Sequence, residues 1–282
     1  MNISHEERAQ VLIQALPYIR EYAGKVVVVK YGGNAMVDSA LTADVMSDLV
    51  LLSLVGVKVV LVHGEGPDVS SVLLRMGKTP QFAAGVRQVD AETAEISQMV
   101  LAGKTNKTLV KLLNSCGGNA VGLCGVDGGM LKVKSAENGE FSGEIESVCV
   151  KPVSDLLEAG YIPVIAATGV DQGMNACSVD ADMASAAIAA ALKAENVILL
   201  ADARGILTDA ADENTLIAQV NVSDVPGLIH KGVISGGMVS KSRCCVEAVR
   251  RGVKKAFIID GRIRHSILIE MLSDKGIGTM FI

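Results

Sequence analysis

The chain has 282 residues, of which 50% are apolar, 20% charged and 3% aromatic, a composition that excludes intrinsic disorder and base-stacking platforms. Its length suits one large α/β unit or two lobes that share a cleft. The net charge of -5, from 26 Lys and Arg against 31 Asp and Glu without a basic run, excludes an electrostatic footprint for nucleic acid.

The first predicted element is an amphipathic helix over residues 4–22. It follows the cap residue Ser4, and its apolar stripe lies at Val11, Leu12, Ala15, Leu16 and Ile19. The helix either packs on its own domain or lies at a subunit interface. Its charged start is unlike a signal peptide, and the six cysteines form no CxxC pair, so we expect reduced thiols in a cytoplasmic protein.

Short β-branched runs then alternate with helical patterns. The predicted strands are 26–30, 57–63, 162–166, 197–201 and 255–259, and the predicted helices are 40–54, 68–76, 91–113, 153–159, 181–194, 238–251 and 266–272. This alternation indicates βαβ units and a mainly parallel sheet between helices. The glycine-rich stretch 116–150 suits hairpins. The apolar run 49–62 is too short and too interrupted to cross a membrane.

Glycines follow several predicted strands, at Gly32, Gly33, Gly64, Gly66 and Gly169. Ligands collect at the carboxyl ends of parallel strands, where glycine lets backbone N–H groups approach an anion. We therefore expect these loops to line one cleft. The chain lacks a Walker A loop, and its GxG at 64–66 does not continue into a dinucleotide fingerprint.

Two lysines have matching positions at glycine-rich turns. Lys30 ends the first strand before two glycines, and Lys241 follows Gly236 and Gly237 in the first turns of a helix. Each lysine is either a cleft residue or a solvated surface residue. Asp180 and Asp182 stand at the start of an Ala-rich helix, where capping alone also explains a carboxylate.

Taken in order, the motifs resemble the amino acid kinase family over essentially the whole chain. They are VVVVKYGGNAM at 26–36, VLVHGEGP at 60–67, GVRQVDAET at 85–93, MVLAGKTNKTLV at 99–110, SVDADMASAAIAAAL at 178–192, VILLADARGIL at 197–207, GGMVSK at 236–241, and FIIDGR with GIGTM between 257 and 280. MVLAGKTNK resembles the members that act on acetylglutamate more than aspartokinases, carbamate kinases or uridylate kinases.

The resemblance implies an α/β fold of two lobes and ATP-dependent phosphorylation of the side-chain carboxylate of N-acetyl-L-glutamate, in arginine biosynthesis. It implies an N-terminal oligomerisation helix at 1–22, a substrate-binding lobe at 23–174 and an ATP-binding lobe at 175–282. A carboxylate is already an ionised nucleophile near neutral pH, so the reaction needs alignment and charge neutralisation rather than a general base. Mg²⁺ is expected to bridge the phosphates without a dedicated protein metal site.

The resemblance also assigns roles to individual residues. Lys30 and Lys241 neutralise the transferring phosphoryl group, and Asp182 positions both lysines. The residues implied for the substrate are Gly64, Glu65, Gly66, Arg87 and Ser178, and those for ATP are Gly32, Gly33, Asp202, Gly205, Gly236 and Gly237. Tyr18, Glu270 and Gly276 match a regulatory site for arginine, and the N-terminal helix matches one that joins dimers into a hexamer.

Three positions depart from the usual family pattern. Glu65 stands where the family usually has glycine, Ser178 where it has asparagine, and Ala201 where it has a hydroxyl residue. Glu65 would repel an anionic substrate unless it faces away or pairs with a neighbour. Two alternatives therefore stay open: a kinase for another acylated amino acid, such as an aminoadipate derivative, and a catalytically weak protein that binds arginine or nucleotide.

Overall fold

The computed structural model describes residues 4–32, 36, 38–65, 67–83, 86–135, 141–209 and 211–282. Its α-helices are α1 (His5–Tyr22), α2 (Ser39–Leu54), α3 (Asp68–Arg75), α4 (Ala91–Gln98), α5 (Asn106–Ser115), α6 (Lys151–Glu158), α7 (Ala181–Ala191), α8 (Val225–His230), α9 (Gly237–Arg250) and α10 (Ser266–Leu272). Its strands are β1 (Val26–Tyr31), β2 (Lys58–His63), β3 (Phe82–Ala83), β4 (Val86–Arg87), β5 (Ala120–Cys124), β6 (Leu131–Ser135), β7 (Gly143–Val148), β8 (Ile162–Ala166), β9 (Thr168–Val170), β10 (Ala176–Ser178), β11 (Asn196–Ala201), β12 (Gln219–Val220), β13 (Lys255–Asp260) and β14 (Thr279–Phe281).

The central sheet has the strand order β12-β14-β13-β11-β1-β2-β8-β5. All neighbours are parallel except β13 and β14. The α/β class with a mainly parallel sheet is therefore confirmed. The stretch 116–150 differs from a simple run of hairpins, because β5 joins the central sheet as a parallel edge strand while β6 and β7 form an antiparallel pair in a second sheet, β10-β9-β6-β7.

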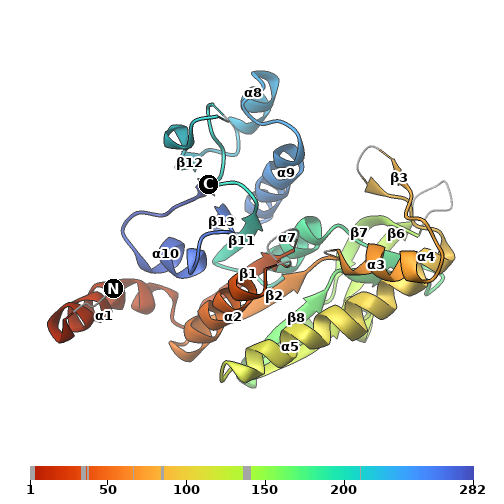
Figure 1. Cartoon of the computed structure of the whole chain (residues 1–282), viewed down its shortest axis with the longest axis horizontal. Helices are drawn as coiled ribbons and strands as arrows, with labels where there is room; N and C mark the ends of the chain where they lie inside the picture. Colours follow the sequence, from red (N-terminus) through yellow and green to blue (C-terminus); the bar gives the residue numbers. More distant parts are fainter. Residues whose placement is uncertain are drawn as a thin grey trace.

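Helices cover both faces of the central sheet, because alternate strand residues point to opposite sides. Val28 on β1 packs in a core that contains α6, α7 and α9 residues, whereas its neighbours Val27 and Val29 pack in a second core with residues of α2, α5 and α10. The cartoon shows α2 beside α5 on one side of the sheet and α7 with α9 toward the other (Figure 1). The sequence prediction of a sheet between helices is confirmed.

The predicted helix 91–113 is interrupted. A π-helical segment at Met99–Thr105 separates α4 from α5. Single π turns of this kind often lie at functional sites. The π-helical segment is followed by Asn106, which is fully buried. The side-chain amide of Asn106 donates to the carbonyl oxygens of Leu123 and Val164. It also lies 3.2 Å from Nε2 of His63. The side-chain amide of Asn106 therefore ties this helix to the strands β2, β5 and β8.

The N-terminal helix α1 begins at the predicted place and extends from the rest of the chain (Figure 1). Ser4 and Glu7 form a reciprocal capping box, in which each side chain accepts from the other residue's backbone N–H. Tyr22 at its end is buried in the core, but Leu12 is 72% exposed and Ile13 is 65% exposed. Most of the helix is therefore left exposed by the described part of the chain. None of the helices in the described parts is long and apolar enough to span a bilayer.

Candidate active site

The site is built where neighbouring parallel strands end. Tyr31 at the end of β1 pairs with His63 at the end of β2, and Ala201 at the end of β11 pairs with Asp260 at the end of β13. The loops after these strands therefore open on the same edge of the sheet. This is the edge at which ligands bind in open α/β sheets.

Three charged side chains from distant parts of the chain meet at this edge. Nζ of Lys30 lies 2.8 Å from Oδ1 of Asp182, and Nζ of Lys241 lies 2.8 Å from Oδ2 of the same carboxylate. The exposed fractions of the side chains are 10% for Lys30, 9% for Asp182 and 20% for Lys241. A largely buried cluster with one net positive charge thus faces the cleft edge. The start of α7 is also capped, but the cap is Asp180, which accepts a hydrogen bond from the N–H of Met183.

The electrostatics of the cluster keep its charges in place. Burial raises the pKa of Asp182, but the ammonium groups of Lys30 and Lys241 lower it more, so the pKa lies below its usual value. Burial lowers the pKa of Lys241, but the carboxylate of Asp182 outweighs this effect and the pKa lies above its usual value. Both Asp182 and Lys241 therefore stay ionised near neutral pH, which suits binding of a phosphoryl group.

Glycines let the backbone approach this cluster. A Cβ on Gly32 would lie 3.2 Å from Nζ of Lys30, and a Cβ on Gly64 would lie 2.9 Å from Cβ of Ala181 at the start of α7. Side chains at these positions would crowd the lysine and push the loop away from Asp182. The N–H of Gly64 donates to the carbonyl oxygen of Tyr31 at 3.3 Å. The predicted site residues Gly33 and Gly66 lie outside the described residues.

The predicted substrate residues form a second cluster. Nε of Arg87 on β4 donates to Oε2 of Glu65 at 3.0 Å, and the hydroxyl of Ser178 on β10 donates to Oε1 of Glu65 at 3.1 Å. Nη2 of Arg87 also donates to the hydroxyl of Ser70 at 2.8 Å. The structure therefore brings Glu65, Arg87 and Ser178 together, and the carboxylate of Glu65 pairs with its neighbours.

Besides the glycines after β1, the residues predicted for ATP lie after β11 and at the start of α9. Asp202 is exposed directly after β11. Gly205 has φ of +144°, and a Cβ there would lie 2.5 Å from Oγ1 of Thr279, so this turn requires glycine. Gly236 has φ of +54° and is the N-cap of α9, whose first residue is Gly237. The N-terminus of α9 and its Lys241 thus approach Asp182 together.

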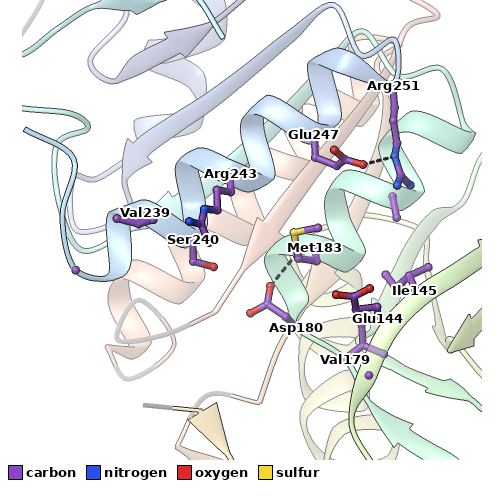
Figure 2. Close-up of a pocket in the computed structure, with 13 residues that line it drawn as sticks. Glu144, Ile145, Val179, Asp180, Met183, Val239, Ser240, Arg243, Glu247 and Arg251 are labelled. Atoms are coloured by element: carbon purple, nitrogen blue, oxygen red, sulfur yellow. Dashed lines mark hydrogen bonds and ion pairs between the residues drawn. The ribbon is translucent and has the colours of Figure 1, made fainter. Parts of the chain in front are cut away.

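A cavity of about 720 Å³ adjoins the start of α7. Asp180, the N-cap of α7, and Met183 on α7 lie opposite Ser240 and Arg243 on α9, and Glu144 on β7 lies to the right of Asp180 in Figure 2. Gly236 also lines this cavity, whereas Asp202 and Gly205 do not. Of the residues predicted for ATP that the structure describes, Gly236 alone lines this cavity.

The predicted regulatory residues line another cavity of about 500 Å³ between α1 and α10, to which Tyr18, Glu270 and Gly276 all contribute. The hydroxyl of Tyr18 donates to Asp274, and Oε2 of Glu270 accepts from the N–H groups of Ile277 and Gly278 at 2.7 and 3.0 Å. The three predicted residues are thus neighbours in space, around the loop that follows α10.

Sequence reasoning missed one pair at the cleft edge. Arg262 donates through Nε and Nη2 to the two carboxylate oxygens of Asp260, at 2.9 and 2.7 Å, at the end of β13. The signal was an aspartate that ends a buried apolar strand in FIIDGR, two residues before an arginine. Asp260 is 3% exposed, so this bidentate pair fixes the loop beside Asp202.

No dedicated metal site accompanies these clusters: the described parts of the chain bring no three His, Cys, Asp or Glu side chains together as possible ligands. The carboxylate nearest the two lysines is that of Asp182, and it pairs with both. This donor set fits a Mg²⁺ ion that keeps phosphate oxygens and waters as its ligands rather than one held in a protein cage.

Comparison with known proteins shows a family match over most of the chain. The profile described as the amino acid kinase family matches residues 25–260. An acetylglutamate kinase of Brachyspira hyodysenteriae is 49% identical, covering 99% of this chain and 98% of the relative. An acetylglutamate kinase of a Nostoc species is 48% identical, covering 98% of this chain and 93% of that relative.

Solved structures share the fold at low identity. An N-acetylglutamate synthase from Neisseria gonorrhoeae, complexed with coenzyme A and N-acetyl-glutamate, superposes with a TM-score of 0.83 at 22% identity. The match covers 97% of this chain but 63% of the synthase, so this chain corresponds to only part of that protein. Carbamate kinase from Giardia lamblia bound to AMP-PNP gives a TM-score of 0.65 at 17% identity, covering 93% of this chain and 99% of the kinase.

Proposed function

The chain belongs to the amino acid kinase family, and from this we propose that it transfers the γ-phosphoryl group of ATP to the side-chain carboxylate of N-acetyl-L-glutamate, in arginine biosynthesis. A carboxylate oxygen of the substrate forms the new bond to phosphorus, the bond to the bridging oxygen of ADP breaks, and ADP leaves with that electron pair. The cluster of Lys30, Asp182 and Lys241 carries this proposal, because it supplies two ammonium groups at one point of the cleft edge.

The chemistry needs charge neutralisation more than proton transfer. The substrate carboxylate is ionised near neutral pH, so a buried base would add nothing. Lys30 and Lys241 approach from β1 and α9 and bind the phosphoryl oxygens, whose charge is spread in the transition state. Asp182 holds both ammonium groups at 2.8 Å and so fixes their positions before ATP binds. The same intact cluster speaks against a protein that only senses its ligands.

Substrate binding is assigned to the loop and strands around Arg87. Its planar guanidinium matches the α-carboxylate of N-acetyl-L-glutamate, and the Ser178 hydroxyl and the backbone of the 64–66 loop complete this side. The side-chain exposure of Arg87 is 10%, so its ion pairs are weakly screened by solvent. This leaves the substrate's side-chain carboxylate to reach toward Lys30.

ATP is assigned to the opposite side, along the loops after β1 and β11 and the start of α9. The carbamate kinase bound to AMP-PNP, which shares the fold, supports ATP as the nucleotide. Asp202, Gly205, Gly236 and Gly237 are the contacts proposed on the C-terminal side, with Gly32 and Gly33 after β1. Mg²⁺, held by the phosphate oxygens and water, withdraws charge from the phosphates when bound.

The proposed division is a substrate-binding lobe at 23–174 and an ATP-binding lobe at 175–282, with Ser178 contacting the substrate from the second lobe and Gly32 and Gly33 contacting ATP from the first. The predicted oligomerisation segment 1–22, which contains α1, is proposed to join dimers into a hexamer through the exposed apolar residues of α1. The cavity lined by Tyr18, Glu270 and Gly276 is proposed to bind arginine as an inhibitor, with the Glu270 carboxylate as partner for its guanidinium.

The absence of a disulfide in the described chain supports a reducing cytoplasm.

A substrate panel tests the proposed function. ADP release is measured with N-acetyl-L-glutamate, an N-acetylated aminoadipate and N-acetyl-L-aspartate, each at saturating Mg-ATP. The proposal predicts the highest kcat/KM with N-acetyl-L-glutamate. Higher kcat/KM with the aminoadipate derivative would instead assign the chain to the longer substrate, and binding of N-acetyl-L-glutamate in calorimetry without any turnover would favour the sensing alternative.

A further inference from the structure

We propose that Glu65 is an internal competitor of the substrate: its carboxylate occupies the guanidinium of Arg87 and the hydroxyl of Ser178 until the α-carboxylate of N-acetyl-L-glutamate displaces it. The inference rests on the proposed function, because it concerns the same substrate groups. It makes Glu65 a residue that sets substrate affinity rather than one that takes part in phosphoryl transfer.

The geometry is that of a bound carboxylate. Each oxygen of Glu65 has its own donor, Nε of Arg87 at 3.0 Å and the hydroxyl of Ser178 at 3.1 Å. These donors come from β4 and β10, and Glu65 comes from the loop after β2, so three separate segments converge on one carboxylate. A carboxylate offered by a substrate would need the same two donors, since a charge-assisted bond to arginine is the strongest contact available there.

The donors are held in place independently of Glu65. Nη2 of Arg87 donates to the hydroxyl of Ser70 on α3 at 2.8 Å, and Ser178 pairs through its backbone with Thr168 of β9. Removal of the Glu65 charge therefore leaves Arg87 and Ser178 near their present positions. The side chain of Glu65 itself is 24% exposed, against 10% for Arg87, so the carboxylate can move toward solvent more readily than the guanidinium can.

Displacement has a definite consequence for affinity. In a fraction of the molecules Glu65 has left Arg87. If the substrate binds only these molecules, its apparent Kd equals its intrinsic Kd divided by that fraction. Two carboxylates near one guanidinium also repel each other, which adds to the cost of binding. The opposite role, in which Glu65 positions Arg87 for the substrate, predicts that loss of the carboxylate weakens binding. The two roles therefore differ in the sign of the change in KM.

The test compares the wild-type chain with Glu65→Gln, which keeps the size of the side chain, and Glu65→Gly, which removes it. The matched control is Glu146→Gln, which removes one charge from an exposed position of β7 outside the lining of the cavity beside α7. KM and kcat for N-acetyl-L-glutamate are measured at saturating Mg-ATP, with KM for ATP as a second readout and circular dichroism as a check of folding.

We expect both Glu65 variants to lower KM for N-acetyl-L-glutamate by about tenfold, with kcat within about twofold and KM for ATP unchanged, as for a site freed from an internal ligand. The Glu146 variant is expected to match wild type. An unchanged or raised KM in Glu65→Gln, with an active wild type, overturns the inference and leaves the proposed function intact. No turnover by any of the four proteins overturns the proposed function, and this inference with it.

Discussion

Oδ1 of Asp182 lies 2.8 Å from Nζ of Lys30, although the first residue stands in the opening turn of α7 and the second near the end of β1. The other carboxylate oxygen of Asp182 binds Lys241, so one buried carboxylate sets the separation of two ammonium groups. This arrangement places two positive charges where a phosphoryl group can bridge them. Both lysines are held in position before the reaction begins.

The first prediction concerns Asp182→Asn. Loss of the carboxylate leaves two buried ammonium groups without a counter-charge, so we expect the free energy of unfolding to fall by about 3 kcal/mol. We also expect kcat to fall by about a hundredfold, because the lysines lose their fixed positions. Urea unfolding and steady-state kinetics measure the two effects.

The control for this prediction is Asp155→Asn, which removes an aspartate paired with Lys151 at 2.8 Å on the exposed face of α6. A surface pair of this kind contributes little, so the free energy of unfolding is expected to change by at most about 1 kcal/mol. Equal effects of the Asp182 and Asp155 substitutions on stability and kcat would contradict a special role for the buried cluster.

A second prediction concerns pH and His63, which is fully buried at the end of β2. Burial lowers the pKa of His63 from 6.5 to about 4, so the folded protein holds it neutral while the unfolded chain binds a proton below pH 6.5. The His63 contribution to stability is therefore fully present above pH 6.5 and is lost as the pH falls toward 4, by about 3 kcal/mol in all.

Urea unfolding of wild type and His63→Gln between pH 4 and 7 isolates this effect, because the other titrating groups are common to both proteins. Glutamine keeps an acceptor for the Asn106 amide, which lies 3.2 Å from Nε2 of His63. The variant should lose less stability than wild type on acidification. His230→Gln, at an exposed position, should behave as wild type. Parallel pH profiles for wild type and His63→Gln would refute the prediction.

Much of the fold follows from the sequence because its strands are strongly patterned. The runs that became β1, β2, β11 and β13 are buried on both faces, so their continuous apolar character predicts parallel strands without any knowledge of tertiary contacts. The strands β12 and β14 contain two and three residues and have no period that a sequence pattern could reveal. The sequence also does not predict the π-helical segment at Met99–Thr105, because the apolar spacing around it is still that of an α-helix.

The site could be predicted only in part, for a different reason. Glycines after strands locate the cleft edge, but the meeting of Lys30 with Asp182 depends on how α7 packs against the sheet, and only the family resemblance suggested it. The pairing of Glu65 with Arg87 depends on how β4 lies against the loop after β2. Sequence reasoning could state that Glu65 needs a partner, because an isolated carboxylate would repel the substrate, but it could not say which residue provides it.

A third prediction concerns α1. Leu12 and Leu16 are 72% and 49% exposed on this chain, so a second copy is expected to cover them. The double variant Leu12→Lys with Leu16→Lys should lower the mass in light scattering from that of a hexamer to that of a dimer. Ala9→Lys, also at an exposed position of α1, serves as the charge control. An unchanged mass in the double variant would reject helix exchange through α1.

The central claim is that Lys30 and Lys241, held by Asp182, stabilise transfer of the γ-phosphoryl group of ATP to the side-chain carboxylate of N-acetyl-L-glutamate. Its most direct test is ADP release by the wild-type chain with Mg-ATP, with and without N-acetyl-L-glutamate, beside Lys30→Ala. We predict ADP release that depends on N-acetyl-L-glutamate in the wild type and a kcat lower by about a hundredfold or more in Lys30→Ala. Release that is independent of N-acetyl-L-glutamate, or equal in the two proteins, would contradict the account.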